Sequence, residues 1–355
     1  MGIYLLDDFV QAHGQYSGYS RLIPALQDLS SQVHPFRKRK KLIYQLLGKA
    51  DCLMKGIKRP HDYRSGIELA FYGYTRRLRS DSIHHVLSFD GHYPFWNRWE
   101  KAPENLVATI HAGDPQQRVL RFPAMLSNLD RLSSAIVLSR NSIPFLETHV
   151  GANRVKFVHH GVDTDFFCPG GSYDIPHRLM FVGRIRRNTA MLRRVVLRLV
   201  QMYPDMRFDF VGTTSPEKDG ELRELLGHPA VVWHRHVSDQ ALRALYQRSY
   251  LLLQPLNKTS ANNAVVEALA CGLPVVATEG DGITDYGGGT IFPVVPNDDD
   301  EAMIDMIERY LQDPAWRDEV ATECRRFAET TLAWPVAARE HLDAYAELYS
   351  GATWD

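Results

Sequence analysis

The sequence predicts an α/β protein with two doubly wound domains. Short and nearly continuous apolar runs recur in both halves of the chain, and segments of helical spacing separate them. Such runs are typical of parallel strands that are buried on both faces, and strands that alternate with helices favour doubly wound sheets. The chain also has 355 residues, a length that suggests two domains at roughly 100–200 residues each.

Nine segments are predicted strands, four in the first half and five in the second. They cover residues 3–8, 85–90, 106–111, 135–139, 179–182, 207–211, 231–234, 250–254 and 274–278. Residues 191–203 are predicted helical, because apolar side chains such as Leu192, Val196 and Leu199 recur at helical spacing.

The domain boundary is predicted near residues 160–173, which are rich in Gly, Pro and Asp and have no sustained period. Charge also differs along the chain. Residues 1–150 hold 20 Lys and Arg against 13 Asp and Glu, a balance of +7, whereas the remainder holds 21 against 29, a balance of −8. This asymmetry predicts two domains with different partners, and the net charge of −1 gives no indication of nucleic-acid binding.

The composition excludes several classes of protein. Apolar residues (45%) and charged residues (23%) occur near the average of soluble domains, which excludes global disorder. Four scattered cysteines predict neither a disulfide framework nor a zinc site, and they indicate a reducing compartment. No apolar run approaches the about 20 residues that span a bilayer, so a cytoplasmic protein is expected. The basic stretch from Arg37 to Lys41 predicts a peripheral contact with the inner face of a membrane, with a solvated loop as the alternative.

Residues 255–278 predict a short helix at the end of a strand. Residue types that cap helix N-termini stand before or at its start, namely Thr259, Ser260, Asn262 and Asn263. Gly272 suits the position just past the helix C-terminus. Because the helix would begin at the carboxyl edge of a parallel sheet, its free N–H groups are expected to face a ligand, and they favour a phosphate.

Glu267 lies about one turn inside this predicted helix. An ionised carboxylate only accepts hydrogen bonds, and it can take two hydroxyl donors such as those of a ribose. The alternative is an ordinary capped crossover helix with a surface glutamate.

Residues 181–189 form a second candidate site. A predicted strand ends at Gly183, where the lack of a side chain permits close approach to the backbone, and Arg184 offers a guanidinium fork to a diphosphate. Arg186 and Arg187 add positive charge. The alternative is a solvated basic turn.

Polar residues also follow predicted strands in the first half. Gly14 and Gly18 come after the first strand and could let the backbone approach a ligand, although their spacing is not the dinucleotide fingerprint. His111 ends a strand, and Asp90 and His92 occupy the equivalent place on the preceding one. A histidine there can donate to a sugar hydroxyl or polarise a reacting group; a structural histidine is the alternative.

Together these segments resemble the retaining GT-B glycosyltransferases of group 1 (family 4 type), which use nucleotide-sugar donors. The similar stretches are VATIHAG (107–113), AIVLSRNS (135–142), HHGVDTDFF (159–167), FVGRI (181–185), EALACGLPVVAT (267–278) and LAWPVAAREHLDAYAEL (332–348). They cover most of residues 105–349, and the signature at 267–278 with its flanking pieces is specific.

The resemblance implies an organisation and an activity. The fold would be GT-B, with an acceptor-binding domain over residues 1–165 plus about 336–355 and a donor-binding domain over 166–335. The domains would face a cleft, and a C-terminal helix would cross back to the first domain. The activity would be metal-independent transfer, with retention, of a sugar from a UDP- or GDP-linked donor to a glycan, lipid-linked or small-molecule acceptor. No cofactor would be needed besides this co-substrate.

The resemblance also implies roles for single residues. His111, Arg184 and Glu267 would be the catalytic set, acting near the reacting centre, at the diphosphate and at the ribose. The full donor set would be Gly14, Gly18, Gly183, Arg184, Thr259, Ser260, Asn262, Asn263 and Glu267. The acceptor side would hold Asp90, His92 and His111.

Three departures from the family pattern leave two other functions open. Thr259 stands where the family has the first of two glutamates, Asn188 and Thr189 stand near the place of its diphosphate-binding lysine, and the first loop lacks a Gly-Gly pair. One alternative is another enzyme on the same scaffold, such as a nucleotide-sugar epimerase or a phosphorylase. The other is a nucleotide-sugar-binding protein without catalysis.

Overall fold

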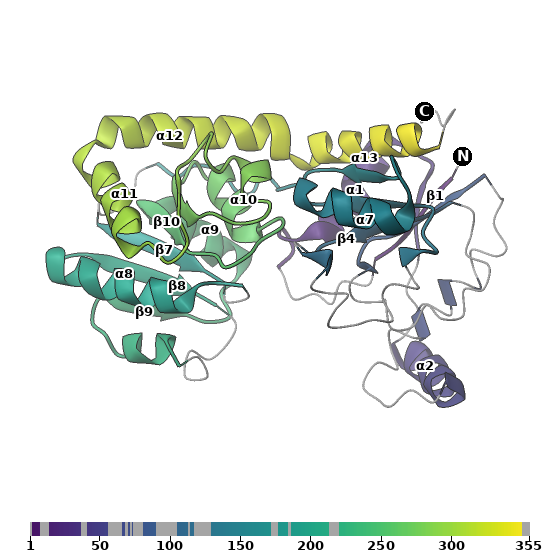
Figure 1. Cartoon of the computed structure of the whole chain (residues 1–355), viewed down its shortest axis with the longest axis horizontal. Coiled ribbons are helices and arrows are strands. Elements are labelled where there is room, and N and C mark those ends of the chain that lie inside the picture. Colours follow the sequence, from purple (N-terminus) through teal and green to yellow (C-terminus); the bar gives the residue numbers. More distant parts are fainter. Residues whose placement is uncertain are drawn as a thin grey trace. The chain divides into compact units, whose positions relative to one another are not determined.

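The computed structural model describes residues 2–7, 14–36, 41–55, 66–67, 70–71, 73, 81–89, 105–112, 114–116, 129–171, 177–183, 186–212 and 220–349 (Figure 1). The contacts divide the chain into two units. Unit 1 comprises Met1–Ala12, Tyr19–Val158 and Ala337–Asp355, and unit 2 comprises His13–Gly18 and His159–Val336. Each unit has its own parallel sheet and its own apolar core.

Unit 1 contains a parallel sheet in the order β2-β1-β3-β4-β5-β6. Its strands are β1 (Ile3–Leu6), β2 (Val33–Pro35), β3 (Ile83–Val86), β4 (Leu106–Ile110), β5 (Ser134–Val137) and β6 (Val155–Phe157). Its helices include α1 (Leu22–Leu29), α2 (Lys41–Lys55), α7 (Ile143–Val150) and the greater part of α13 (Trp334–Leu348). The sheet core is almost wholly aliphatic, as the apolar runs predict.

One strand of unit 1 starts earlier than the sequence predicts. The strand expected at residues 85–90 is β3 at Ile83–Val86, in register with β1 so that His84 lies opposite Tyr4 and His85 opposite Leu5. Both histidines are buried. The prediction missed Ile83 and His84 because a hydrophobicity pattern treats histidine as polar, whereas His84 is buried in the sheet and its ring stacks with that of Tyr4.

Unit 2 contains a second parallel sheet in the order β12-β11-β10-β7-β8-β9. Its strands are β7 (Arg178–Val182), β8 (Arg207–Val211), β9 (Val231–His234), β10 (Leu251–Gln254), β11 (Val275–Thr278) and β12 (Val294–Val295). Its helices include α8 (Thr189–Met202), α9 (Asp239–Arg248), α10 (Asn263–Ala270), α11 (Asp300–Gln312) and α12 (Pro314–Phe327).

The predicted α/β class is confirmed in both units. All nine predicted strands correspond to observed ones, whereas β2, β6 and β12 were not predicted. These three strands have only two or three residues, too few for a period to be recognised. Within the part of the chain that the structure describes, no helix is both long and apolar enough to cross a membrane.

Candidate functional site

The sheet of unit 2 changes its winding direction between β7 and β10. From β7 the sheet continues through β8 and β9, and on the other side through β10, β11 and β12. Open α/β proteins bind ligands outside the carboxyl ends of the strands at such a switch point. The segments that follow the two strands meet there, since the Asn188 N–H donates to the Pro255 carbonyl (3.0 Å) and the Asn257 N–H to the Arg186 carbonyl (3.0 Å). Both candidate segments of the donor side therefore lie at one place.

Helix α10 begins at this switch point. Its N-cap is Asn262, whose Oδ1 accepts a hydrogen bond from the Ala264 N–H at 3.1 Å. Thr259 is not the cap, because its hydroxyl donates to the Ser260 carbonyl at 3.0 Å. The helix ends as predicted, with Gly272 at φ +64° and the Leu273 N–H bonded to the Ala268 carbonyl.

Of the basic residues after β7, Arg187 lies at the start of α10. Arg184 lies outside the described residues. The Arg187 Nη2 donates to Asn262 Oδ1 (3.2 Å) and its Nε donates to the Val182 carbonyl (3.1 Å). Burial lowers the pKa of the guanidinium to about 10, so Arg187 remains charged at neutral pH. Gly183 makes room for it, because a Cβ there would lie 2.8 Å from Nη2 and the backbone has a φ of +88°. The structure thus places a fixed positive charge beside the N-terminus of α10.

Three polar atoms at this switch point are buried without a hydrogen-bond partner among the described residues. They are Gln254 Oε1, Ser260 Oγ and Asn262 Nδ2. Leaving such an atom unpaired costs roughly 1–3 kcal/mol, so native proteins seldom do so without a reason. Two of the three can donate a hydrogen bond, as a hydroxyl and an amide, and they accompany the charge of Arg187. This combination suits an anionic, oxygen-rich ligand.

Glu267 lies one turn inside α10, as predicted, and it is only 4% exposed. Its Oε1 accepts from the Ser17 hydroxyl at 2.7 Å, and its Oε2 accepts from the Tyr246 hydroxyl at 3.0 Å. Burial raises the pKa of the carboxyl to about 7, although these two hydrogen bonds oppose the shift. Each carboxylate oxygen has a second lone pair, so Glu267 can still accept from further hydroxyls.

The loop of residues 14–18 packs beside α9 and α10. The Tyr16 N–H donates to Asp239 Oδ2 (3.1 Å), and the Tyr16 ring stacks on Phe166 at 3.8 Å between centroids. Gly14 approaches Asp239 so closely that a Cβ would lie 1.5 Å from its Oδ1. Gly18 has a φ of +88°. Gly14 therefore permits a close approach to Asp239 and Gly18 a turn, whereas their predicted approach to a ligand stays a prediction.

Residues 176–313 match the family model described as glycosyl transferases group 1. The matched stretch is about two fifths of the chain and lies wholly within unit 2. Helix α10, Glu267, Arg187 and Asn262 all fall within the matched residues.

Curated relatives match a longer stretch of the chain. D-inositol 3-phosphate glycosyltransferase from Nocardiopsis dassonvillei is 28% identical over 268 residues, which are 67% of this chain and 61% of that protein. The enzyme of the same name from Thermobifida fusca is 27% identical over 259 residues, 66% of this chain and 59% of that protein. The match therefore spans about three fifths of the length of these relatives.

Solved structures share the fold of this chain. Sucrose-phosphate synthase from Thermosynechococcus elongatus matches with a TM-score of 0.74 at 16% identity, over 99% of this chain and 100% of that one. HepE (Alr3699) from Anabaena, determined in complex with UDP and glucose, matches with a TM-score of 0.70 at 14% identity, over 98% and 99%. These matches confirm the predicted two-domain, Rossmann-like GT-B fold.

Of the three residues predicted on the acceptor side, the structure describes His111 but not Asp90 or His92. His111 follows β4, and its Nε2 lies 2.7 Å from the Leu87 carbonyl oxygen. Because a carbonyl only accepts, Nε2 carries the proton, and any acid–base chemistry of the neutral imidazole would use Nδ1. The ring edge of Tyr19 packs against His111 at 4.8 Å between centroids.

Tyr19 belongs to a buried chain of hydrogen bonds in unit 1. His341 Nδ1 donates to the Ala337 carbonyl, so its Nε2 accepts from the Tyr19 hydroxyl at 2.6 Å. Tyr19 then accepts from Thr109, which in turn accepts from His85 Nε2, and His85 Nδ1 accepts from Tyr345. Burial lowers the pKa of His341 to about 4 and that of His85 well below its ordinary value. These histidines are neutral and structural.

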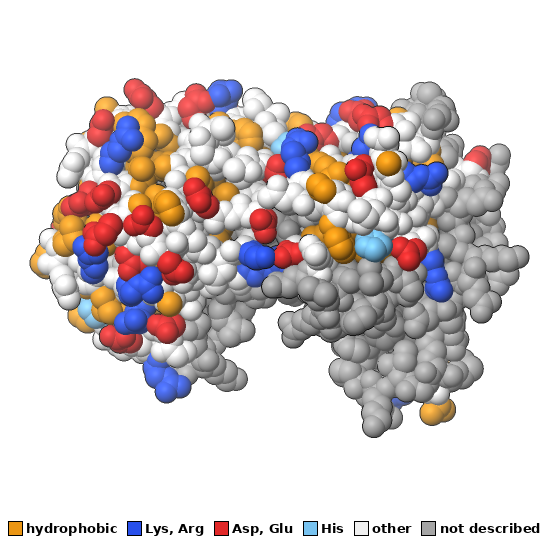
Figure 2. Space-filling view, viewed as in Figure 1, with side chains coloured by type: hydrophobic (Ala, Val, Ile, Leu, Met, Phe, Trp, Pro, Cys, Tyr) orange, Lys and Arg blue, Asp and Glu red, His pale blue; other side chains and the backbone are white. Residues whose placement is uncertain are grey.

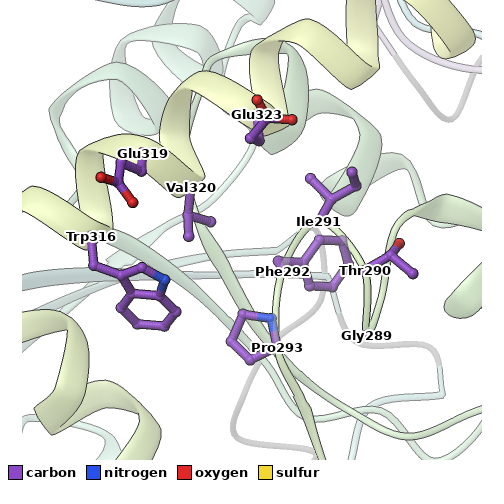
Figure 3. A pocket seen from close by; sticks show the side chains of 9 residues that line it. All are labelled: Gly289, Thr290, Ile291, Phe292, Pro293, Trp316, Glu319, Val320 and Glu323. Atoms are coloured by element: carbon purple, nitrogen blue, oxygen red, sulfur yellow. The ribbon is translucent and has the colours of Figure 1, made fainter.

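Two cavities in the described part of unit 2 lie at the opposite edge of its sheet. One of about 310 Å³ lies between the loop before β12 and helix α12, where Trp316, Val320 and Phe292 form its wall (Figure 3). The other, of about 540 Å³, is lined by Leu273 and Ser249, which precede β11 and β10. Both therefore adjoin the amino ends of strands, away from the switch point at the carboxyl edge.

Sequence reasoning missed three contributors to the site. Arg187 was recognised only as added charge, and its partner Asn262 is 75 residues away. Ser17 and Tyr246 lie 250 and 21 residues from Glu267. No local pattern marks either hydroxyl, because both come to Glu267 through tertiary packing.

Proposed function

We propose that the protein is a glycosyltransferase that moves a sugar from a UDP- or GDP-linked donor to a glycan, lipid-linked or small-molecule acceptor. The reaction would retain the anomeric configuration and need no metal. The match of residues 176–313 to the model described as glycosyl transferases group 1 supports the general activity. The UDP and sugar that accompany HepE, and the UDP and GlcNAc that accompany the pneumococcal transferase GtfA, support a nucleotide-sugar donor.

One observation carries this proposal. Buried polar atoms of Ser260 and Asn262, which have no hydrogen-bond partner in the described part of the chain, lie at the N-terminus of α10 beside the buried charge of Arg187. A donor diphosphate would supply acceptor oxygens to these donors, and the helix N-terminus favours its negative charge. Arg184 and the loop of Gly14 and Gly18 would complete the phosphate contacts.

The same donors would assist bond breaking. Negative charge grows on the departing diphosphate as the glycosidic bond to the sugar lengthens, and fixed cations and N–H groups stabilise that charge without reorganisation. Arg187 would take the place of the family lysine that the sequence lacks. This source of positive charge makes a metal-independent reaction the expectation.

Glu267 would hold the ribose of the nucleotide. Ser17 and Tyr246 orient its carboxylate, and each of its oxygens keeps capacity for one further hydroxyl. Thr259 and Asn263 would lie nearer the sugar or its phosphate. On the acceptor side, His111 would contact the sugar near the reacting centre, with Asp90 and His92 beside the acceptor. His111→Ala should then reduce turnover far more than nucleotide affinity.

Calorimetry with UDP and GDP, followed by a panel of their sugars, tests the proposal. Binding of one nucleotide, and release of that nucleotide from its sugar only when an acceptor is present, are the expected results. Isomerised donor in the absence of acceptor would instead establish an epimerase. Nucleotide binding without turnover on any acceptor would favour a binding protein. Addition of EDTA should leave turnover unchanged.

A further inference from the structure

Helix α2 of unit 1 exposes an unusual amount of apolar surface. Among the described residues, seven large apolar side chains are exposed, and five of them lie on this helix: Leu42, Ile43, Leu46, Leu47 and Leu53. Leu42 is 64% exposed, Leu46 59% and Leu53 82%. In Figure 2, orange atoms protrude at the end of unit 1 where Figure 1 draws α2. Clustered exposed apolar residues mark interaction sites, whereas scattered ones need no explanation.

The helix has one packed side and one open side. Tyr44 is buried, and a Cβ at Gly66 would lie only 1.9 Å from the Tyr44 carbonyl oxygen, so another backbone segment packs closely there. At about 100° per residue, Leu42, Leu46 and Leu53 fall on the opposite side of α2 from Tyr44. Their spacing of four and seven residues forms one continuous stripe. The open side therefore carries an apolar stripe that runs from Leu42 to Leu53.

The sequence around this stripe is strongly basic. Residues 37–59 contain nine Lys and Arg and a single acid, Asp51, a balance of +8 in a chain whose net charge is −1. Lys49 is exposed and lies beside the stripe. Apolar area and positive charge thus occur in the same short segment.

The combination of exposed apolar side chains and positive charge distinguishes between the possible binding partners of α2. A second copy of the chain would bring two segments of +8 together, which is unfavourable. Nucleic acid would use the charge but leave the five aliphatic side chains in water. A bilayer with anionic lipids accepts both, because aliphatic side chains enter the acyl boundary while Lys and Arg stay at the head groups. We infer that the open side of α2 docks on the surface of an anionic lipid bilayer.

Flotation of the full chain with lipid vesicles, without donor or acceptor, tests this inference independently of glycosyl transfer. Vesicles of phosphatidylcholine with about one third phosphatidylglycerol should bind the protein, and vesicles of pure phosphatidylcholine should bind it about tenfold less or weaker still. The combined variant Leu42→Ser, Leu46→Ser and Leu53→Ser should lose about tenfold or more of this binding. Replacing each residue from Arg37 to Lys41 by Gln should weaken binding and reduce its dependence on salt.

The matched control is Met202→Ser with Val232→Ser, which removes two apolar side chains of 44% exposure from unit 2. This control should bind vesicles like the wild type. The inference fails if the triple leucine variant, with an unchanged melting temperature, still binds as the wild type does. It also fails if no vesicle binds, or if the stripe instead supports a dimer that the leucine substitutions dissolve in size-exclusion chromatography.

Discussion

Two groups of buried polar side chains, one in each unit, differ in how completely their hydrogen bonds are satisfied. In unit 1, each ring nitrogen of His85 and His341 has a partner, and one backbone carbonyl at Ala337 sets the direction of the whole chain of bonds. In unit 2, Ser260 Oγ and Asn262 Nδ2 have no partner among the described residues. The first group holds elements of the fold together, and the second is the group that we propose binds the donor.

The two groups also differ in charge: the group in unit 1 is neutral, and the group in unit 2 contains charged side chains. The pKa of His341 falls to about 4 because of burial, so it stays neutral under ordinary conditions. Arg187 is buried yet charged, and the pKa of Glu267 is raised to about 7, where it titrates near neutrality. A structural network avoids charge, whereas a binding site keeps charge in place at a cost to stability.

The largest expected effect is on stability, from His341→Ala. The substitution leaves a cavity and removes the acceptor of the buried Tyr19 hydroxyl, which together should cost roughly 3–5 kcal/mol. Urea unfolding measures the loss. Calorimetry with nucleotide should show unchanged affinity in the folded variant; a matching loss of affinity would contradict the separation of the two groups.

Arg187→Gln should come next, with an effect on binding. Loss of hydrogen bonds to a charged group costs roughly 1.5–3 kcal/mol, or about ten- to a hundredfold in affinity for the nucleoside diphosphate. Affinity for the nucleoside alone should be unchanged, because it carries no phosphate. Arg193→Gln is the matched control, since Arg193 pairs with Glu221 and Glu224 away from the switch point.

Glu267 should make nucleotide binding depend on pH. Its pKa is raised above the ordinary value, so the carboxyl is protonated below about pH 7 and ionised above it. The ionised form accepts the ribose hydroxyls better, and affinity should therefore rise by about an order of magnitude from pH 6 to pH 8. The control is Glu267→Gln. With this variant the phosphate of the nucleotide still titrates, but the carboxyl of the protein is absent. Equal pH profiles for the two proteins would remove Glu267 from the ribose site.

Thr259→Ala should have the smallest effect on nucleotide binding. Within the described residues its hydroxyl bonds only to the neighbouring Ser260 carbonyl, so stability should fall by about 0.5–1.5 kcal/mol and affinity for free nucleotide should barely change. Turnover or preference among donor sugars should change, because Thr259 stands where the family has a sugar-side glutamate. An unaltered donor panel would show that Thr259 is only structural.

The basic stretch from Arg37 to Lys41 shows the limit of local patterns. It predicted a membrane contact, yet residues 37–40 lie outside the described part of the chain. The apolar stripe of the adjoining α2 was not recognised, because apolar helical spacing usually indicates a side buried in the core. Only packing reveals that Tyr44 faces inward and the leucines face outward.

The sequence by itself determined the α/β class, most strands, and the helix α10 with Glu267 one turn inside it. These features depend on neighbours within a few residues: burial periodicity, caps and a glycine in the left-handed region. Tertiary structure alone decided that Arg187 reaches Asn262, that Ser17 and Tyr246 reach Glu267, and that β7 lies beside β10. Those contacts join residues up to 250 positions apart, and strand order is set by the packing of whole elements rather than by any local pattern.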